Sequence, residues 1–385
     1  MNKPVPVNEP LLNGNEINYL MESIKSGWIS GEGPFVKQFE QKVAAYVGRK
    51  YAIAVCNGTA ALELAVAALN LEQGSEIILP TFTIISCAAA IIRRGCIPVL
   101  VDSDPVTWNM DVGQIEKKIT PKTKAIMVVH IYGLPVDMEP VLRLAKKYRL
   151  KVIEDASEVI GQTYKGKFCG SMGDISTFSF YANKNITTGE GGMVLTDSEE
   201  LAEHCSLMRN LCFNPKNRYA HEELGYNFRM TNLQAAVGLG QLERIDDIVR
   251  RKRTTGKHYT ASLSDIGCFQ LPLEFNSYAV NIYWVYGIVL KDEVPFDANE
   301  VMRRLEQKRI GTRPFFWPIH EQPVFRRMGL FSKESYPVAE RLARRGFYIP
   351  SGLALTAEQR IHVTTTLKAI IGGEIYNESF RQFLF

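Results

Sequence analysis

Residues 179–192 read Ser-Phe-Tyr-Ala-Asn-Lys-Asn-Ile-Thr-Thr-Gly-Glu-Gly-Gly, and this stretch places a lysine, Lys184, directly after an apolar strand pattern. The threonines and glycines around Lys184 indicate a tight turn of the backbone. A lysine in a turn is usually solvated. A lysine amine that is kept from water, however, is the group that forms Schiff bases with aldehydes. The stretch alone leaves both interpretations open.

The residues around this stretch alternate between short apolar runs and helical patterns. Such alternation indicates right-handed crossovers and a mostly parallel sheet. We therefore expect one large α/β domain. Its strands are predicted at residues 51–55, 76–79, 97–101, 125–130, 151–153, 176–180 and 192–195, and its helices at 60–68, 86–93 and 138–148.

The chain of 385 residues is too long for one small core, and its pattern changes along its length. We expect an irregular N-terminal arm over residues 1–35, the large domain over residues 36–250, and a smaller α+β domain over residues 251–385. A charged helix at 242–258 joins the two domains in this prediction. The small domain is predicted to contain strands at 283–290 and 362–366 and helices at 298–308 and 335–345.

The composition excludes several classes of protein. A net charge of +4 is too small for the basic surface of a nucleic-acid-binding protein. The seven cysteines include no Cys-x-x-Cys pair, which indicates neither a disulfide framework nor a metal site. No apolar stretch approaches the ~18 residues that cross a membrane, and the first residues lack a signal-peptide pattern. We expect a cytoplasmic protein that binds neither membranes nor nucleic acid and holds no metal.

Polar residues follow several of the predicted strands, and in a parallel sheet such strand ends meet at one site. The run Asn57-Gly58-Thr59 opens a helix, where backbone N–H groups favour an anion, although Thr59 is equally suited to a plain N-cap. Asp155 ends a strand, where it either caps a helix or pairs with a buried cation. Phe82 is suited to stack on a ring or to join the core.

The combination of these runs resembles the DegT/DnrJ-type sugar aminotransferases. The resemblance begins with the run 179–192 and extends over nearly the whole chain. This family consists of fold-type I enzymes that use pyridoxal 5′-phosphate (PLP). Their architecture is similar to that of aspartate aminotransferase: a mostly parallel mixed sheet sandwiched by helices, with a smaller α+β C-terminal domain. Further matching runs are Gly27-Trp28-Ile29-Ser30-Gly31, residues 57–62, residues 132–138, Glu154-Asp155-Ala156 and residues 225–232.

The resemblance implies a role for each matching residue. Lys184 is the Schiff-base lysine and proton shuttle, and Asp155 pairs with the pyridine nitrogen of PLP. Relatives with His in place of Lys184 catalyse dehydration, so the lysine favours transamination. Asn227 reaches the cofactor phosphate of a neighbouring subunit, which implies a homodimer and leaves a tetramer open. The remaining implied cofactor contacts are Gly58, Thr59 and Ser179 at the phosphate, Phe82 against the ring, and Glu158 near the ring hydroxyl, where many relatives carry Gln or His.

Within the family, the chain resembles the branch that transfers an amino group from L-glutamate to C4 of GDP-4-keto-6-deoxymannose, giving GDP-perosamine. For the nucleotide-sugar we predict contacts from Trp28, Ser30, Phe316 and His320, although the aromatic run around Phe316 also suits a buried corner. A UDP- or dTDP-linked keto-sugar, or amination at C3, remains an alternative. An alternative of another class is a PLP-binding regulator without turnover. A Rossmann dehydrogenase is disfavoured because no Gly-x-Gly-x-x-Gly run follows the first strand.

Overall fold

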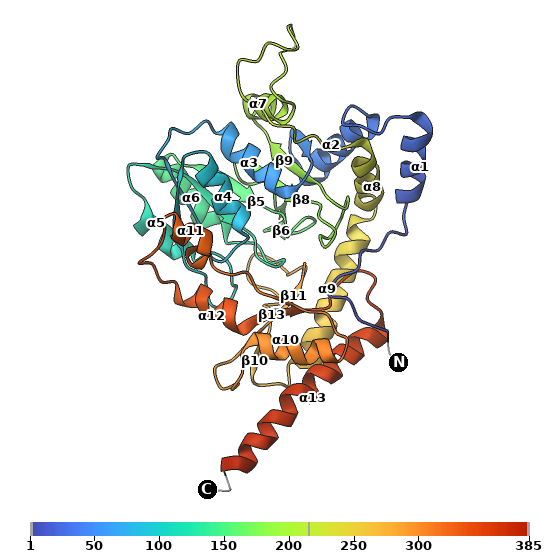
Figure 1. Ribbon diagram of the computed structural model, residues 1–385, viewed down its shortest axis with the longest axis vertical. Helices are drawn as coiled ribbons and strands as arrows, with labels where there is room; N and C mark the ends of the chain where they lie inside the picture. Colours follow the sequence, from blue (N-terminus) through green and yellow to red (C-terminus); the bar gives the residue numbers. More distant parts are fainter. Residues whose placement is uncertain (1–2, 215, 383–385) are drawn as a thin grey trace.

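A seven-stranded sheet forms the centre of the large domain in the computed structural model, which describes residues 3–214 and 216–382 and side-chain burial to residue 372 (Figure 1). The strand order is β1-β9-β8-β5-β4-β2-β3. Only β9 runs antiparallel to its neighbours in this sheet, so the predicted mostly parallel mixed sheet is confirmed. The strands are β1 (Tyr51–Val55), β2 (Glu76–Pro80), β3 (Ile97–Val101), β4 (Thr123–Val129), β5 (Lys151–Asp155), β8 (Ile175–Ser179) and β9 (Gly192–Thr196).

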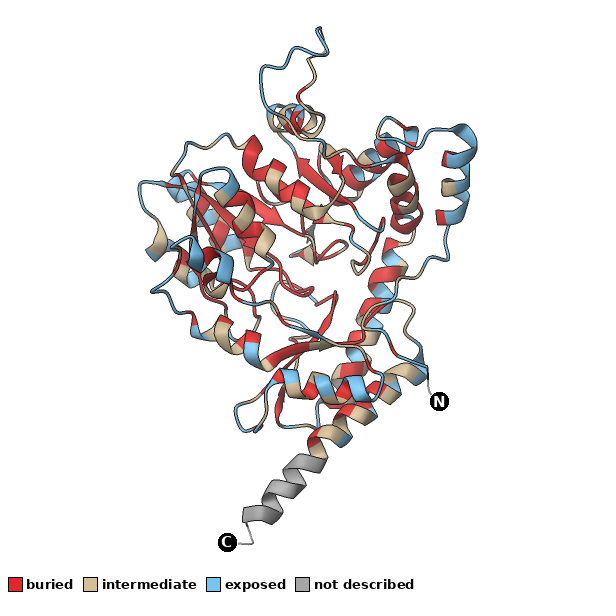
Figure 2. Cartoon of the chain, viewed as in Figure 1, coloured by how far each residue is buried: buried red, intermediate tan, exposed pale blue. Residues whose placement is uncertain are grey.

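Helices cover both faces of this sheet. Because successive side chains of a strand point to opposite faces, each strand contributes residues to two separate hydrophobic cores, one on each face. In β2, Ile77 and Leu79 join one core while Ile78 joins the other. The strands are therefore buried on both sides, as Figure 2 shows. The first core is covered by α3 (Gly58–Ala68), α4 (Ile85–Arg93) and α7 (Glu199–Arg209), and the second by α2 (Pro34–Val47), α6 (Met138–Tyr148) and α8 (Asn232–Leu242).

The long helix α9 (Ile245–Leu263) leads from the large sheet to a second, antiparallel sheet of four strands (Figure 1). This sheet has the order β10-β11-β13-β12 and lies within the predicted small domain. Its strands are β10 (Phe269–Gln270), β11 (Tyr286–Leu290), β12 (Arg313–Pro314) and β13 (Gly346–Ile349), and the helices around it are α10 (Ala298–Gln307), α12 (Pro337–Arg345) and α13 (Ala357–Gln382). The short elements are α5 (Ile115–Lys118), α11 (Pro323–Arg327), β6 (Thr163–Tyr164), β7 (Lys167–Phe168), and the 3-10 turns η1 (Val112–Gln114) and η2 (Ile319–Glu321).

Three sequence predictions need correction. The arm over residues 1–35 is not irregular throughout, because it contains α1 (Glu16–Ser26), which packs on α8 (Figure 1). The strand predicted at 362–366 lies inside α13, where Val363 and Leu367, four residues apart, bury one helical stripe. The helix predicted at 242–258 begins later and ends later, at Ile245 and Leu263, because α8 ends at Leu242.

All seven cysteines are free thiols. Among the helices of the described residues, none combines the length and the apolar character that crossing a bilayer requires.

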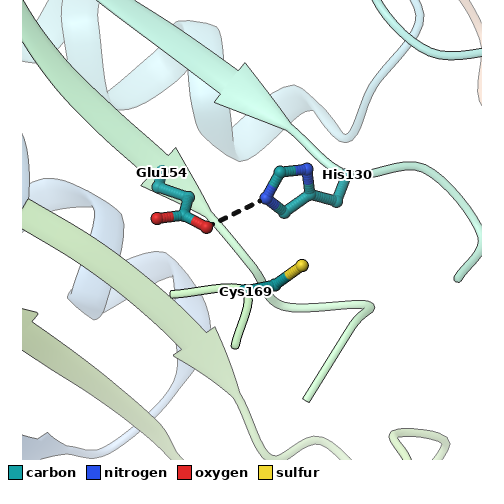
Figure 3. A group of neighbouring side chains, drawn as sticks. All are labelled: His130, Glu154 and Cys169. Atoms are coloured by element: carbon teal, nitrogen blue, oxygen red, sulfur yellow. Dashed lines mark hydrogen bonds and ion pairs between the residues drawn. The ribbon is translucent and has the colours of Figure 1, made fainter. Parts of the chain in front are cut away.

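The buried carboxylate of Glu154 links β5 by hydrogen bonds to two neighbouring segments of the same chain, His130 and residues 170–173 (Figure 3). It accepts hydrogen bonds from His130 Nε2 at 3.1 Å and from three backbone N–H groups, those of Gly170, Met172 and Gly173, at 2.5–3.0 Å. Burial by itself would raise the pKa of Glu154, but the His130 bond and the N–H groups lower it. Although Cys169 completes a group with metal-ligand chemistry, converging N–H groups favour an anion rather than a cation.

We expect Glu154→Gln to lower the free energy of unfolding by about 3 kcal/mol, because an amide nitrogen would face N–H donors in a buried site. Urea denaturation at fixed protein concentration measures this loss. Glu139→Gln is the matched control, since Glu139 is exposed and pairs with Lys165 at the surface. Equal stability of Glu154→Gln and the native chain would contradict this account of β5.

Candidate functional site

A pocket of about 620 Å³ opens at the ends of β1, β5 and β8. These strand ends supply polar residues, and segments next to the small sheet supply an aromatic side. The pocket therefore lies where the sequence predicted convergence. Of the predicted site residues, Gly58, Thr59, Asp155, Glu158, Ser179, Lys184 and Phe316 line it.

The N-terminus of α3 forms one end of the pocket. Asn57, not Thr59, caps the helix, since its side chain accepts the N–H of Ala60 at 2.8 Å. Gly58 lies so close to Ser179 that a Cβ on it would stand 2.7 Å from the Ser179 Cβ. The first N–H groups of a helix lack partners within the helix and carry a partial positive charge. Together with the Ser179 hydroxyl, this end of the pocket suits a phosphate.

Asp155 presents a buried carboxylate to the pocket. Its oxygens accept hydrogen bonds from Ser157 N at 3.1 Å, Thr177 Oγ1 at 3.2 Å and Cys87 Sγ at 3.5 Å. Burial, followed by the charge of Asp155, raises the pKa of the Cys87 thiol, which therefore acts as a neutral donor. These three hydrogen-bond donors are neutral groups, and the carboxylate lines the pocket, where it suits a cationic group.

Lys184 points into the pocket, and its side chain is only 11% exposed. Its Nζ lies 3.9 Å from Glu158 Oε1 and 3.8 Å from the centre of the Trp284 ring. Burial lowers the pKa of Lys184, while the charges of Glu158 and Asp155 oppose this change. Burial raises the pKa of Glu158 to about 7 against the opposing charge of Lys184. Of the two interpretations of Lys184, the geometry favours the desolvated amine.

Five of the predicted residues lie outside the pocket lining of their own chain. Phe82 is completely buried and packs on Phe316, so it belongs to the wall behind the pocket. Trp28, Ser30 and Asn227 are exposed. The prediction for His320 needs correction: the side chain is buried, and its ring nitrogens are bonded to Thr81 and Glu340, which leaves neither for a sugar.

Sequence reasoning missed several residues of the aromatic side, above all Trp284 and Tyr348. Trp284 fell inside a strand predicted from Tyr283, but β11 begins only at Tyr286. Residues before the strand are thereby free to turn toward the pocket. The apolar run itself carries no signal that distinguishes a core tryptophan from a pocket tryptophan.

The residues present fit PLP. The anion cradle of Gly58 and Ser179 suits its phosphate, the buried Asp155 suits a protonated ring nitrogen, and the desolvated Lys184 amine suits its aldehyde.

Comparison with known proteins gives a consistent result. Residues 10–368 match the model of the DegT/DnrJ/EryC1/StrS aminotransferase family. The chain is 42% identical to a GDP-perosamine synthase of Escherichia coli O157:H7, covering 95% of this chain and 98% of that protein. It is 40% identical to a GDP-perosamine synthase of Caulobacter vibrioides, covering 95% and 98%. The crystal structure of S. venezuelae DesV superposes with a TM-score of 0.88 at 28% identity, covering 96% of this chain and 99% of DesV.

We expect Gly58→Ala to weaken the binding of inorganic phosphate about tenfold, because the new Cβ would push the start of α3 away from Ser179. Isothermal titration with phosphate measures this change. Gly267→Ala is the matched control, since a Cβ at Gly267 would meet no atom within 4 Å. Unchanged phosphate affinity in Gly58→Ala would show that the cradle lies elsewhere.

Proposed function

Because the chain belongs to the DegT/DnrJ/EryC1/StrS aminotransferase family, we propose that it transfers an amino group from L-glutamate to C4 of GDP-4-keto-6-deoxymannose, forming GDP-perosamine. The observation that carries this proposal is the identity of about 40% with two proteins named GDP-perosamine synthase, over nearly their full length. The free cysteines suit a reducing compartment, and we place the enzyme in the cytoplasm.

The chain is a PLP-dependent aminotransferase. When bound, PLP supplies an aldehyde that combines with amines and a protonated ring that accepts electrons. In our proposal, Lys184 holds the aldehyde carbon and Asp155 holds the ring nitrogen in its protonated form. The phosphate of PLP is held by Gly58, Thr59 and Ser179. Glu158 lies near the hydroxyl of the PLP ring. Phe82 packs on Phe316 and supports that side of the ring.

Lys184 also moves the proton in this proposal. Because its pKa is lowered by burial, a larger fraction of the amine is neutral near pH 7 than in a solvated lysine. A neutral Nζ removes the proton from Cα of glutamate and later delivers a proton to C4 of the sugar. Lys184 thus serves both substrates in turn. The amino group of glutamate would stay on bound PLP after 2-oxoglutarate leaves and until the sugar enters, which gives ping-pong kinetics.

The proposed activity is tested by incubating the chain with PLP, L-glutamate and GDP-4-keto-6-deoxymannose, with the UDP- and dTDP-linked 4-keto-6-deoxy sugars in parallel. We expect 2-oxoglutarate and a 4-amino sugar from the GDP substrate, identified by mass spectrometry and NMR. Lys184→Ala should lose both turnover and the absorbance of lysine-bound PLP.

Preferred turnover of a UDP or dTDP substrate, or an amino group at C3, would replace the substrate assignment. An absorbance change with glutamate but no turnover of any sugar would favour a regulator.

We further propose that the enzyme is a homodimer whose sites are shared. Ile17, Met21 and Ile24 form an exposed apolar stripe along α1, and Trp28 continues it. Stripes of this kind mark contact surfaces. Asn227 is exposed outside its own pocket, beside Phe228, which lines it. A symmetric partner would bring its own Asn227 to this pocket, where the amide completes the phosphate site.

Shared sites predict rescue between two defective subunits. In a heterodimer of Lys184→Ala and Asn227→Ala subunits, one site has both residues intact and the other has neither, so we expect about half of the native activity. Tandem purification with two different tags isolates this heterodimer for assay. If Asn227 acted in its own subunit, every site would carry one defect and the heterodimer would be no more active than the two variants alone.

A further inference from the structure

Trp284 lies between the small sheet and the loop that carries Lys184. The centre of its ring is 3.8 Å from Lys184 Nζ, and the ring lines the pocket. Glu158 Oε1, at 3.9 Å from the same nitrogen, is beyond hydrogen-bond distance. The face of the indole is therefore an immediate neighbour of the amine that the proposed reaction uses.

Three hydrogen bonds hold Trp284 and its surroundings. The indole Nε1 donates to the carbonyl of Asn183, the residue before Lys184, at 2.8 Å. The carbonyl of Trp284 accepts from Lys252 Nζ at 2.6 Å, and the same Nζ donates to the carbonyl of Ser351 at 2.7 Å. Lys252 is buried in α9, and burial lowers its pKa to about 7. An amine can donate two hydrogen bonds whether charged or neutral, so the tether persists in both states.

The backbone before Trp284 is confined as well. Tyr283 adopts a left-handed conformation with φ of 53°, and its N–H donates to Asn281 Oδ1 at 2.7 Å. A Cβ on Gly133 would stand 2.7 Å from the backbone nitrogens of Tyr283 and Trp284, and a Cβ on Gly256 would stand 2.3 Å from the Tyr283 ring. A strained conformation persists only where its surroundings enforce it, and such positions cluster at functional sites.

These contacts of Trp284 bear on the conformational entropy that a catalytic lysine loses when its side chain is fixed. A side chain with four rotatable bonds must hold its amine at one point, and the entropy of fixing it opposes this. An aromatic face attracts an ammonium group and limits where it can lie. The indole also donates a hydrogen bond to the backbone carbonyl of Asn183. It therefore fixes the position of the Lys184 amine relative to the loop that carries this lysine.

We propose that Trp284 is a positioning residue that holds the amine of Lys184 at the Glu158 side of the pocket, and that Lys252 supports it. This inference rests on the proposed role of Lys184. In this inference the small domain helps to position the catalytic lysine. It does so through Trp284, which belongs to none of the polar runs at the strand ends of the large sheet.

The test uses the PLP-free chain, so that it does not depend on turnover. The pH dependence of Lys184 acetylation by acetic anhydride, followed by peptide mass spectrometry, gives the pKa of this one amine. Trp284→Leu removes the ring face that favours the ammonium form, so the pKa of Lys184 should fall by about one unit, a tenfold change in the free amine at a given pH. The charged and titratable neighbours, Glu158, Asp155 and Cys87, are the same in both proteins.

Two further variants distinguish the effect of the Trp284 ring from that of the Lys252 hydrogen bond to the Trp284 carbonyl. Trp284→Phe keeps an aromatic face and should restore most of the pKa, while Lys252→Met should shift it in the same direction as Trp284→Leu but less. Trp317→Leu is the matched control, because Trp317 is 47% exposed, lies outside the pocket lining and packs under Arg344. If Trp284→Leu yields no folded chain, Trp284→Met provides the same comparison with less loss of volume.

An unchanged pKa in Trp284→Leu, or an equal shift in Trp317→Leu, would overturn the inference. Failure of the proposed function is detected separately, by borohydride reduction of the native chain with PLP and mapping of the modified lysine. If PLP were attached to a lysine other than Lys184, the proposed function would fail, whatever the acetylation experiment gave.

Discussion

The carboxylate of Glu154 is the interaction on which the geometry of the pocket depends. It joins His130, after β4, and the backbone of residues 170–173, before β8, to the middle strand β5. Adjacent residues of a strand point to opposite faces, so anchoring Glu154 on one side presents Asp155 on the other. The strand that carries the pocket's buried carboxylate is thus held by a second buried carboxylate, which is satisfied entirely within the protein.

The pocket contains an amine and two carboxylates with little access to water. Burial acts on Lys184 and Glu158 in opposite senses, since it disfavours the charged form of each. Their mutual attraction opposes both changes but acts over 3.9 Å, without a hydrogen bond. Burial therefore lowers the pKa of Lys184 and raises that of Glu158, while the hydrogen bonds to Asp155 come from neutral donors.

Prediction from the sequence succeeded where local pattern and function coincide. The short apolar runs separated by helical patterns predicted a mostly parallel sheet, and all seven predicted strands are present in it. It failed where a side chain's surroundings come from distant segments. His320 follows an aromatic run that suggested a sugar pocket, yet Thr81 and Glu340 occupy its ring nitrogens. Val363 and its neighbours have β-branched side chains, yet α13 packs against α9 and α10, and this burial selects a helix.

The sequence by itself determined the seven strands of the large sheet, three of the helices that cover it (α3, α4 and α6), and the family of the chain. These follow from local periodicity and from runs such as 179–192, whose residues are adjacent in the chain. Only the tertiary structure decided that Trp284 faces Lys184, that Asn57 caps α3, and that Lys184 is desolvated. Each of these depends on contacts between residues far apart in sequence; Lys184 and Trp284 are separated by 100 positions and meet because α9 brings the small sheet back to the pocket. Burial and proximity are properties of the packed chain, and no local pattern encodes them.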